Sequence, residues 1–96
     1  MITVIARLKS KPGQETLLAQ GCMQLAREVR EKEEGCLMYI PHVAADNPAE
    51  ILFVEKYVDQ AAFDAHVQTP YFKTMTAQFR AILTEEPSLQ IMKELA

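Results

Sequence analysis

Three side chains in this 96-residue chain have the right chemistry for proton transfer: His66, Glu55 and Tyr57. Histidine has an ordinary pKa near neutral pH, so His66 can act as a general base. It shares a helical face with Phe63 and precedes a break at Thr69-Pro70, where irregular backbone lets side chains converge. Glu55 and Tyr57 are two residues apart in a β-rich run and therefore lie on one face of a strand. We take these three residues as the catalytic candidates.

Each candidate also has a structural interpretation. His66 could cap or hydrogen-bond a helix end instead of acting as a base. Glu55 could hold His66 in one tautomer or accept a substrate proton, or it could be a solvated or salt-bridged strand charge. Tyr57 could stack on a planar substrate and offer its hydroxyl, or it could be a half-buried strand residue.

A second set of side chains could form the wall of a binding cavity. The candidates for contact with a substrate are Tyr39, Phe53, Phe63, Tyr71 and Met75. Packing in the core is the alternative for each, and for methionine in particular. The other histidine, His42, is expected at the surface. No cluster of cysteine and histidine has the spacing of metal ligands, so we expect no metal site.

The composition is that of one globular domain, which we assign to residues 1–96. The net charge of −3 argues against nucleic acid as a partner. No apolar run approaches the ~20 residues that cross a bilayer, and the first residues resemble a strand more than a signal peptide. We therefore expect a cytoplasmic protein in which Cys22 and Cys36 are free thiols.

Hydrophobic periodicity and Pro or Gly punctuation divide the chain into strands and helices. The predicted strands are 2–9, 36–44, 50–58 and 88–93, and the predicted helices are 14–33 and a two-piece helix capped by Asp59 and Thr69. Pro41 indicates an edge strand or a bulge, and Gly35 occupies the place of a left-handed helix cap.

This order predicts an α+β fold of the ferredoxin-like βαββαβ type, with two helices on one face of an antiparallel sheet. The strands carry apolar residues on both faces: Ile51 and Phe53 on one, Leu52 and Val54 on the other. Two helices cover only one face, so we expect the other face to pack against a second copy of the chain.

Four strings in the sequence resemble the antibiotic biosynthesis monooxygenase family, and most closely its quinol-monooxygenase-like branch. They are TVIARLKSKPGQ at 3–14, EEGCLMY at 33–39, ILFVEKY at 51–57 and AFDAHVQTPYF at 62–72. The resemblance implies a dimeric α+β barrel with a pocket between sheet and helices in each subunit. It also implies oxidation of a quinol or phenol by O₂ without flavin, metal or haem.

The resemblance also bears on individual residues. His66 matches the histidine of the family's A-x-x-A-H-x-x-[ST]-P stretch. Tyr57 stands where many relatives carry Trp, and Tyr71 replaces a second histidine that many relatives carry after Thr-Pro. These departures put an activity that needs the indole, or two histidines, in doubt.

The resemblance implies a mechanism in which a phenol or enol is deprotonated and its anion reacts directly with O₂. This requires a base, hydrogen bonds to the oxyanion and a dry cavity. Two alternatives stay open: an isomerase or lyase that abstracts a proton from a small oxo-metabolite, and a dimeric ligand-binding module without activity. Haem degradation is disfavoured, because the chain has no Trp and its one Asn is Asn47 in a loop.

Overall fold

Four strands and three helices make up the computed structural model, which describes residues 1–96. In chain order they are β1 (Ile2–Lys9), α1 (Glu15–Lys32), β2 (Cys36–Ala44), β3 (Asn47–Tyr57), α2 (Gln60–Val67), α3 (Pro70–Phe79) and β4 (Ser88–Lys93). The predicted βαββαβ order is confirmed, with the second helix divided into α2 and α3. None of the three helices is long and apolar enough to cross a membrane.

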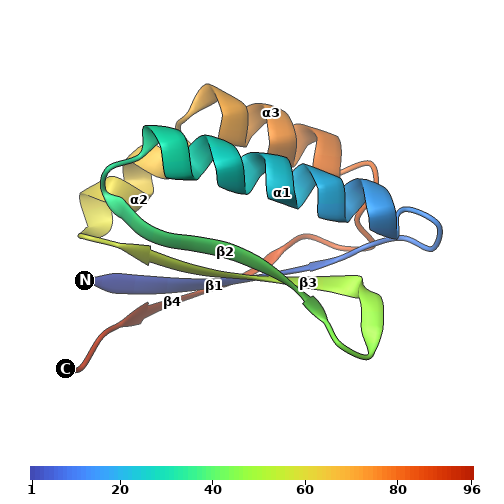
Figure 1. Ribbon diagram of the computed structural model, residues 1–96, viewed down its shortest axis with the longest axis horizontal. Helices are drawn as coiled ribbons and strands as arrows, with labels where there is room; N and C mark the ends of the chain where they lie inside the picture. Colours follow the sequence, from blue (N-terminus) through green and yellow to red (C-terminus); the bar gives the residue numbers. More distant parts are fainter.

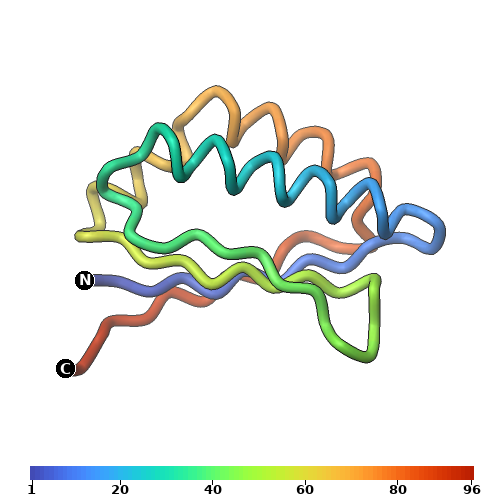
Figure 2. The backbone as a smooth tube through the Cα atoms, in the orientation of Figure 1, coloured from blue at the N-terminus to red at the C-terminus, as the bar shows by residue number.

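The strands form one antiparallel sheet in the order β2-β3-β1-β4. All three helices lie on the same side of it (Figure 1), and both chain termini reach the same end of the sheet (Figure 2). The edge position expected for the strand that contains Pro41 is confirmed. The sheet irregularities of β2 lie at Cys36/Met38 and Val43/Ala44, on either side of the proline.

The core lies between α1 and the two central strands. On β1 every second residue is buried, which places Ile2, Val4, Ala6 and Leu8 toward the helices. On α1 the buried residues form one apolar stripe with helical spacing: Leu18, Cys22, Leu25 and Val29. On β3 the same alternation turns Ile51, Phe53, Glu55 and Tyr57 inward. Glu55 is therefore a carboxylate in an otherwise apolar row.

Two side-chain caps divide the segment between β3 and β4. The Asp59 carboxylate accepts a hydrogen bond from the Ala62 backbone N–H at 2.9 Å and starts α2. The Thr69 hydroxyl accepts from the Phe72 N–H at 3.4 Å and starts α3, with Pro70 at its first position. Thr69 also donates to the His66 carbonyl at 2.8 Å. His66 is thereby fixed on the last turn of α2.

Two local expectations from the sequence are wrong. Strand β3 begins at Asn47, which pairs with Ala44 across a two-residue turn, so Asn47 lies in a strand and not in the loop expected between strands 36–44 and 50–58. Gly35 has no left-handed backbone; only Gly13 has a positive φ, +85°. What requires glycine at 35 is space, because a Cβ there would lie 2.8 Å from the Ala62 Cβ on α2.

The face of the sheet away from the helices is bare (Figure 1). Residues between the inward-facing positions point to it, among them Ile5 on β1, Val54 on β3 and Ile40 on β2, which lie side by side in the strand pairing. All six residues of β4 are exposed, including Leu89 and Ile91 on the helix side of the sheet. The chain thus leaves apolar surface uncovered around β4 and across the open face.

Replacing Gly21 by alanine is expected to destabilise the fold. An alanine Cβ at 21 would lie 2.6 Å from the Phe79 Cε1 atom, and the Phe79 ring is 4% exposed and cannot swing into solvent. Overpacking of this kind costs about 1–3 kcal/mol, which outweighs the gain of at most about 1 kcal/mol in helix propensity. Urea unfolding should show a lower midpoint for Gly21→Ala. The exposed neighbour change Gln20→Ala should leave it unchanged.

Candidate active site

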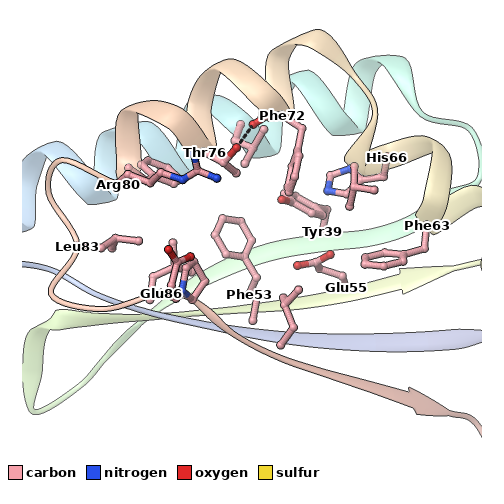
Figure 3. A pocket seen from close by; sticks show the side chains of 17 residues that line it. Tyr39, Phe53, Glu55, Phe63, His66, Phe72, Thr76, Arg80, Leu83 and Glu86 are labelled. Carbon is pink, nitrogen blue, oxygen red and sulfur yellow. Dashed lines mark hydrogen bonds between the residues drawn. The ribbon is translucent and has the colours of Figure 1, made fainter.

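A cavity of about 300 Å³ lies between the helix side of the sheet and the α2–α3 segment. Its wall is mostly apolar and aromatic, and Figure 3 shows the side chains that line it. Glu55 and His66 lie toward one end with Tyr39, Phe63 and Phe72, and Arg80, Leu83 and Glu86 lie toward the other. In the first group Glu55, His66 and Tyr39 are buried and Phe63 and Phe72 are partly buried, whereas Arg80 and Glu86 are exposed. We call these the buried end and the outer end.

His66 is enclosed at the buried end. It is 1% exposed, and the rings of Phe72, Tyr39 and Tyr57 have centroids 4.7, 5.1 and 5.5 Å from the imidazole. Its Nδ1 atom lies 3.0 Å from both carboxylate oxygens of Glu33. Its Nε2 atom makes no hydrogen bond within the chain and is not fully buried by protein atoms. Since His66 lines the cavity, Nε2 is the atom that can meet a ligand.

The surroundings of His66 set its protonation state. Burial lowers the pKa of His66, and the Glu33 carboxylate acts in the opposite direction. The first effect is the larger, so the imidazole is neutral at pH 7. A neutral imidazole that gives Nδ1–H to a carboxylate has its lone pair on Nε2. The geometry therefore presents a base to the cavity.

Glu55 is the second titratable group at the buried end. It is 4% exposed, and the Tyr57 hydroxyl donates a hydrogen bond of 2.6 Å to its Oε1 atom. Burial raises the pKa of Glu55 to about 7; the Tyr57 hydrogen bond opposes this and the Glu33 charge adds to it. At neutral pH Glu55 exists in both protonation states, so it can either donate or accept a hydrogen bond.

The structure brings most of the sequence candidates together. Five of them line the cavity: His66, Glu55, Tyr39, Phe53 and Phe63. Tyr57 lies behind Glu55, fully buried, and does not reach the cavity. Tyr71 lies outside and donates its hydroxyl to Glu33, and Met75 packs against α1 beside Gly21. Neither lines the cavity, because both side chains turn toward α1.

The sequence did not indicate Glu33, and this is the residue it missed. Glu33 is the last residue of the predicted helix 14–33 and follows charged residues of the kind that face solvent, yet it ends α1 and turns inward to His66. Glu55 does not hold the His66 tautomer, because the His66 Nδ1 atom contacts Glu33 and Glu55 is hydrogen-bonded to Tyr57. Glu33 and His66 are far apart in the sequence, and no local pattern links a residue at a helix end to a side chain on a later helix.

The remaining candidates lie elsewhere. His42 is exposed on β2, where its Nδ1 atom lies 3.0 Å from the Ile40 carbonyl. No group of three or more His, Cys, Asp or Glu side chains is placed to hold a metal ion. At the buried end of the cavity, His66, Glu55 and Tyr39 offer proton transfer and hydrogen bonding. The other polar side chains of the lining are Thr76, Arg80 and Glu86.

This fold and site define a class: a ferredoxin-like domain whose helix-covered cavity is lined by a histidine that a carboxylate holds from outside the cavity. The antibiotic biosynthesis monooxygenase family profile matches residues 1–78, so the chain belongs to that family. The Escherichia coli K12 protein named "Probable quinol monooxygenase YgiN" is 33% identical over 95 residues, covering 88% of this chain and 90% of that protein.

Solved structures agree with this assignment. A crystal structure described as an antibiotic biosynthesis monooxygenase is 26% identical, with a TM-score of 0.93 and full coverage of both chains. Rv0793 from Mycobacterium tuberculosis is 26% identical, with a TM-score of 0.91 over 99% of this chain and 95% of that one. The family and fold predicted from the sequence are confirmed.

Glu55 should make stability depend on pH. In the unfolded chain this carboxyl ionises near its ordinary value of 4.5, whereas in the folded protein it keeps its proton up to about pH 7. Between these values the folded state binds more protons, so its stability falls as the pH rises, by about 3 kcal/mol for a shift of this size. Glutamine does not ionise, so the Glu55→Gln variant should not lose stability over this pH range.

The measurement is the free energy of unfolding of both proteins between about pH 4.5 and 7.5. The free energy of unfolding of Glu55→Gln, relative to that of the wild type, should rise as the pH increases. The exposed Glu31→Gln serves as the control and should follow the wild type. Parallel curves for Glu55→Gln and the wild type would show that Glu55 is not held in a desolvated state.

Proposed function

We propose that this protein is a cofactor-independent monooxygenase that oxidises a small quinol or phenol with O₂. The observation that carries the proposal is His66, with Nδ1 held by a carboxylate and Nε2 free at an apolar cavity. Membership of a monooxygenase family and similarity to a protein named as a quinol monooxygenase support it. The same two findings support the coarser assignment to the oxidoreductases.

The reaction starts with proton transfer. His66 Nε2 takes the proton of a substrate hydroxyl, and the O–H electron pair stays on the resulting phenolate. The electron-rich anion then reduces O₂ directly. A quinol supplies all the electrons: one oxygen atom enters the ring to give a hydroxyquinone, and the other leaves as water with the two hydrogens that the substrate loses. An apolar wall keeps bulk water away from the anion.

Glu55 and the cavity size complete the proposal. In its protonated state Glu55 donates a hydrogen bond to a substrate or peroxide oxygen, and Tyr57 fixes its carboxyl orientation. Tyr57 acts here as a positioning residue, because it does not reach the cavity. A volume of about 300 Å³ is at the lower end of the range for ligand pockets and fits a substrate of one or two rings.

A homodimer is part of the proposed functional state. The open face presents Ile5, Ile40 and Val54 as neighbours, and β4 is exposed along its whole length. Leu89 of β4 lines the cavity and is 59% exposed, so one wall of the site is only partly covered. A second copy packed on the open face buries its apolar residues, and it shields Leu89 where it also reaches around the edge strand β4 to the helix side.

Enzyme-dependent O₂ uptake with a panel of quinols tests the activity. Replacement of the base, His66→Ala, is expected to lower kcat/KM by about 10²–10⁴-fold, the usual contribution of a positioned base. Asp64→Asn alters an exposed carboxylate on the same helix and should keep wild-type activity. Turnover without O₂ would favour the isomerase or lyase, and binding without any turnover would favour a ligand-binding module.

The dimer is tested by placing a charge in the open face. Val54→Glu puts a carboxylate between Ile5 and Ile40 without touching the helix-side core, and should convert a dimer into a monomer. Light scattering gives the mass, and circular dichroism confirms the fold. Thr84→Glu lies outside the sheet and should stay dimeric. A monomeric wild type would contradict the proposal.

A further inference from the structure

Glu33 occupies an unfavourable place for a carboxylate. It is the residue that ends α1, where the helix dipole presents its negative end and where basic side chains are preferred. A negative charge there costs roughly 0.3–1 kcal/mol relative to a neutral residue. Its side chain is also only 12% exposed. Helix stability therefore does not account for Glu33, and a compensating contact is required.

That contact is with His66 and Tyr71. Both Glu33 oxygens lie 3.0 Å from His66 Nδ1, and the Tyr71 hydroxyl donates to the Oε2 atom. Three elements meet at this carboxylate: the end of α1, the last turn of α2 and the first turn of α3. Tyr71 leaves Glu33 in one orientation, so the imidazole is held in one orientation as well.

We infer that Glu33, fixed by Tyr71, is the positioning residue for His66 in the reaction proposed above, on which this inference rests. It holds His66 with the proton on Nδ1 and the lone pair on Nε2 facing the cavity. Once Nε2 has taken the substrate proton, the Glu33 charge stabilises the imidazolium. Tyr71 thereby contributes to the site from outside the cavity.

The aromatic surroundings explain why such a partner is needed. An imidazolium among the rings of Phe72, Tyr39 and Tyr57 has lost its water, and a buried charge without a partner is costly. Glu55 is hydrogen-bonded to Tyr57 and makes no hydrogen bond to His66. Glu33 is thus the one carboxylate in hydrogen-bond contact with the base.

Glu33 can be reached from outside. Its outer side borders a surface cleft of about 410 Å³ that also includes Glu34, Cys36, Ala65 and Tyr71. None of these four residues lines the cavity of His66. A small carboxylate such as formate can therefore enter beside His66 Nδ1 when the Glu33 side chain is removed, without using the substrate cavity.

Nitrogen NMR of His66 tests the positioning role without any substrate. In the wild type the proton should be on Nδ1, and Glu33→Gln should keep this tautomer because the amide oxygen still accepts it. Glu33→Ala should shift the proton toward Nε2. Glu34→Gln, an exposed carboxylate of the same cleft, is the control and should match the wild type. An unchanged tautomer in Glu33→Ala would overturn the inference.

Kinetic measurements then distinguish the effect of the Glu33 charge from its effect on the orientation of His66. Glu33→Gln should lower kcat by roughly 10–100-fold, a large part of what a positioned base contributes, with KM nearly unchanged. Formate should restore part of the kcat of Glu33→Ala and have no effect on Glu33→Gln or the wild type. If Glu33→Ala does not fold, the isosteric Glu33→Gln alone decides, and full activity in that variant refutes the inference. A wild type that oxidises no quinol contradicts the proposed function instead, while the NMR result still stands.

Discussion

The arrangement at the buried end depends on one desolvated contact, between the His66 imidazole and the Glu33 carboxylate. Burial among aromatic rings lowers the pKa of a histidine that is 1% exposed, and the Glu33 carboxylate acts against this loss of basicity. The site balances burial against charge. Too much burial would make the base inert, and too little would leave it protonated and admit water.

The fold provides this contact through helix caps and a close backbone approach, each of which is encoded by a short stretch of sequence. Asp59 and Thr69-Pro70 set the start of α2 and of α3, and the short α2 between them delivers His66 on its last turn. Gly35 lets the start of β2 approach Ala62 on α2, which brings the end of α1 alongside the same helix. Each device is small, but together they fix the orientation of one imidazole.

These local devices are why the sequence predicted so much of the fold. Alternation on β1, the stripe on α1 and the caps at Asp59 and Thr69 are all short-range patterns, and each gave the correct element. Glu33 was missed because its partner lies on another helix, and helix periodicity cannot tell a solvated glutamate from one that bends inward at the helix end. Tyr57 was placed on the correct face of its strand, but full burial behind Glu55 depends on packing from α2 that alternation does not encode.

The two ends of the cavity come from different stretches of chain. The proton-transfer groups lie within residues 33–66, inside the span that the family profile matches, whereas Arg80, Leu83, Glu86 and Leu89 follow it. Within that later stretch the turn after α3 is tied to the end of β1, since the Thr84 N–H donates to the Lys9 carbonyl and the Lys11 N–H donates to the Ile82 carbonyl. Residues 85–87 are irregular backbone without such bonds, so substitutions and length changes are best tolerated there. Such a layout separates substrate selection from the proposed acid–base chemistry. Side chains within residues 80–89 can change which compounds fit, while the residues between 33 and 66 that carry the proposed reaction stay the same.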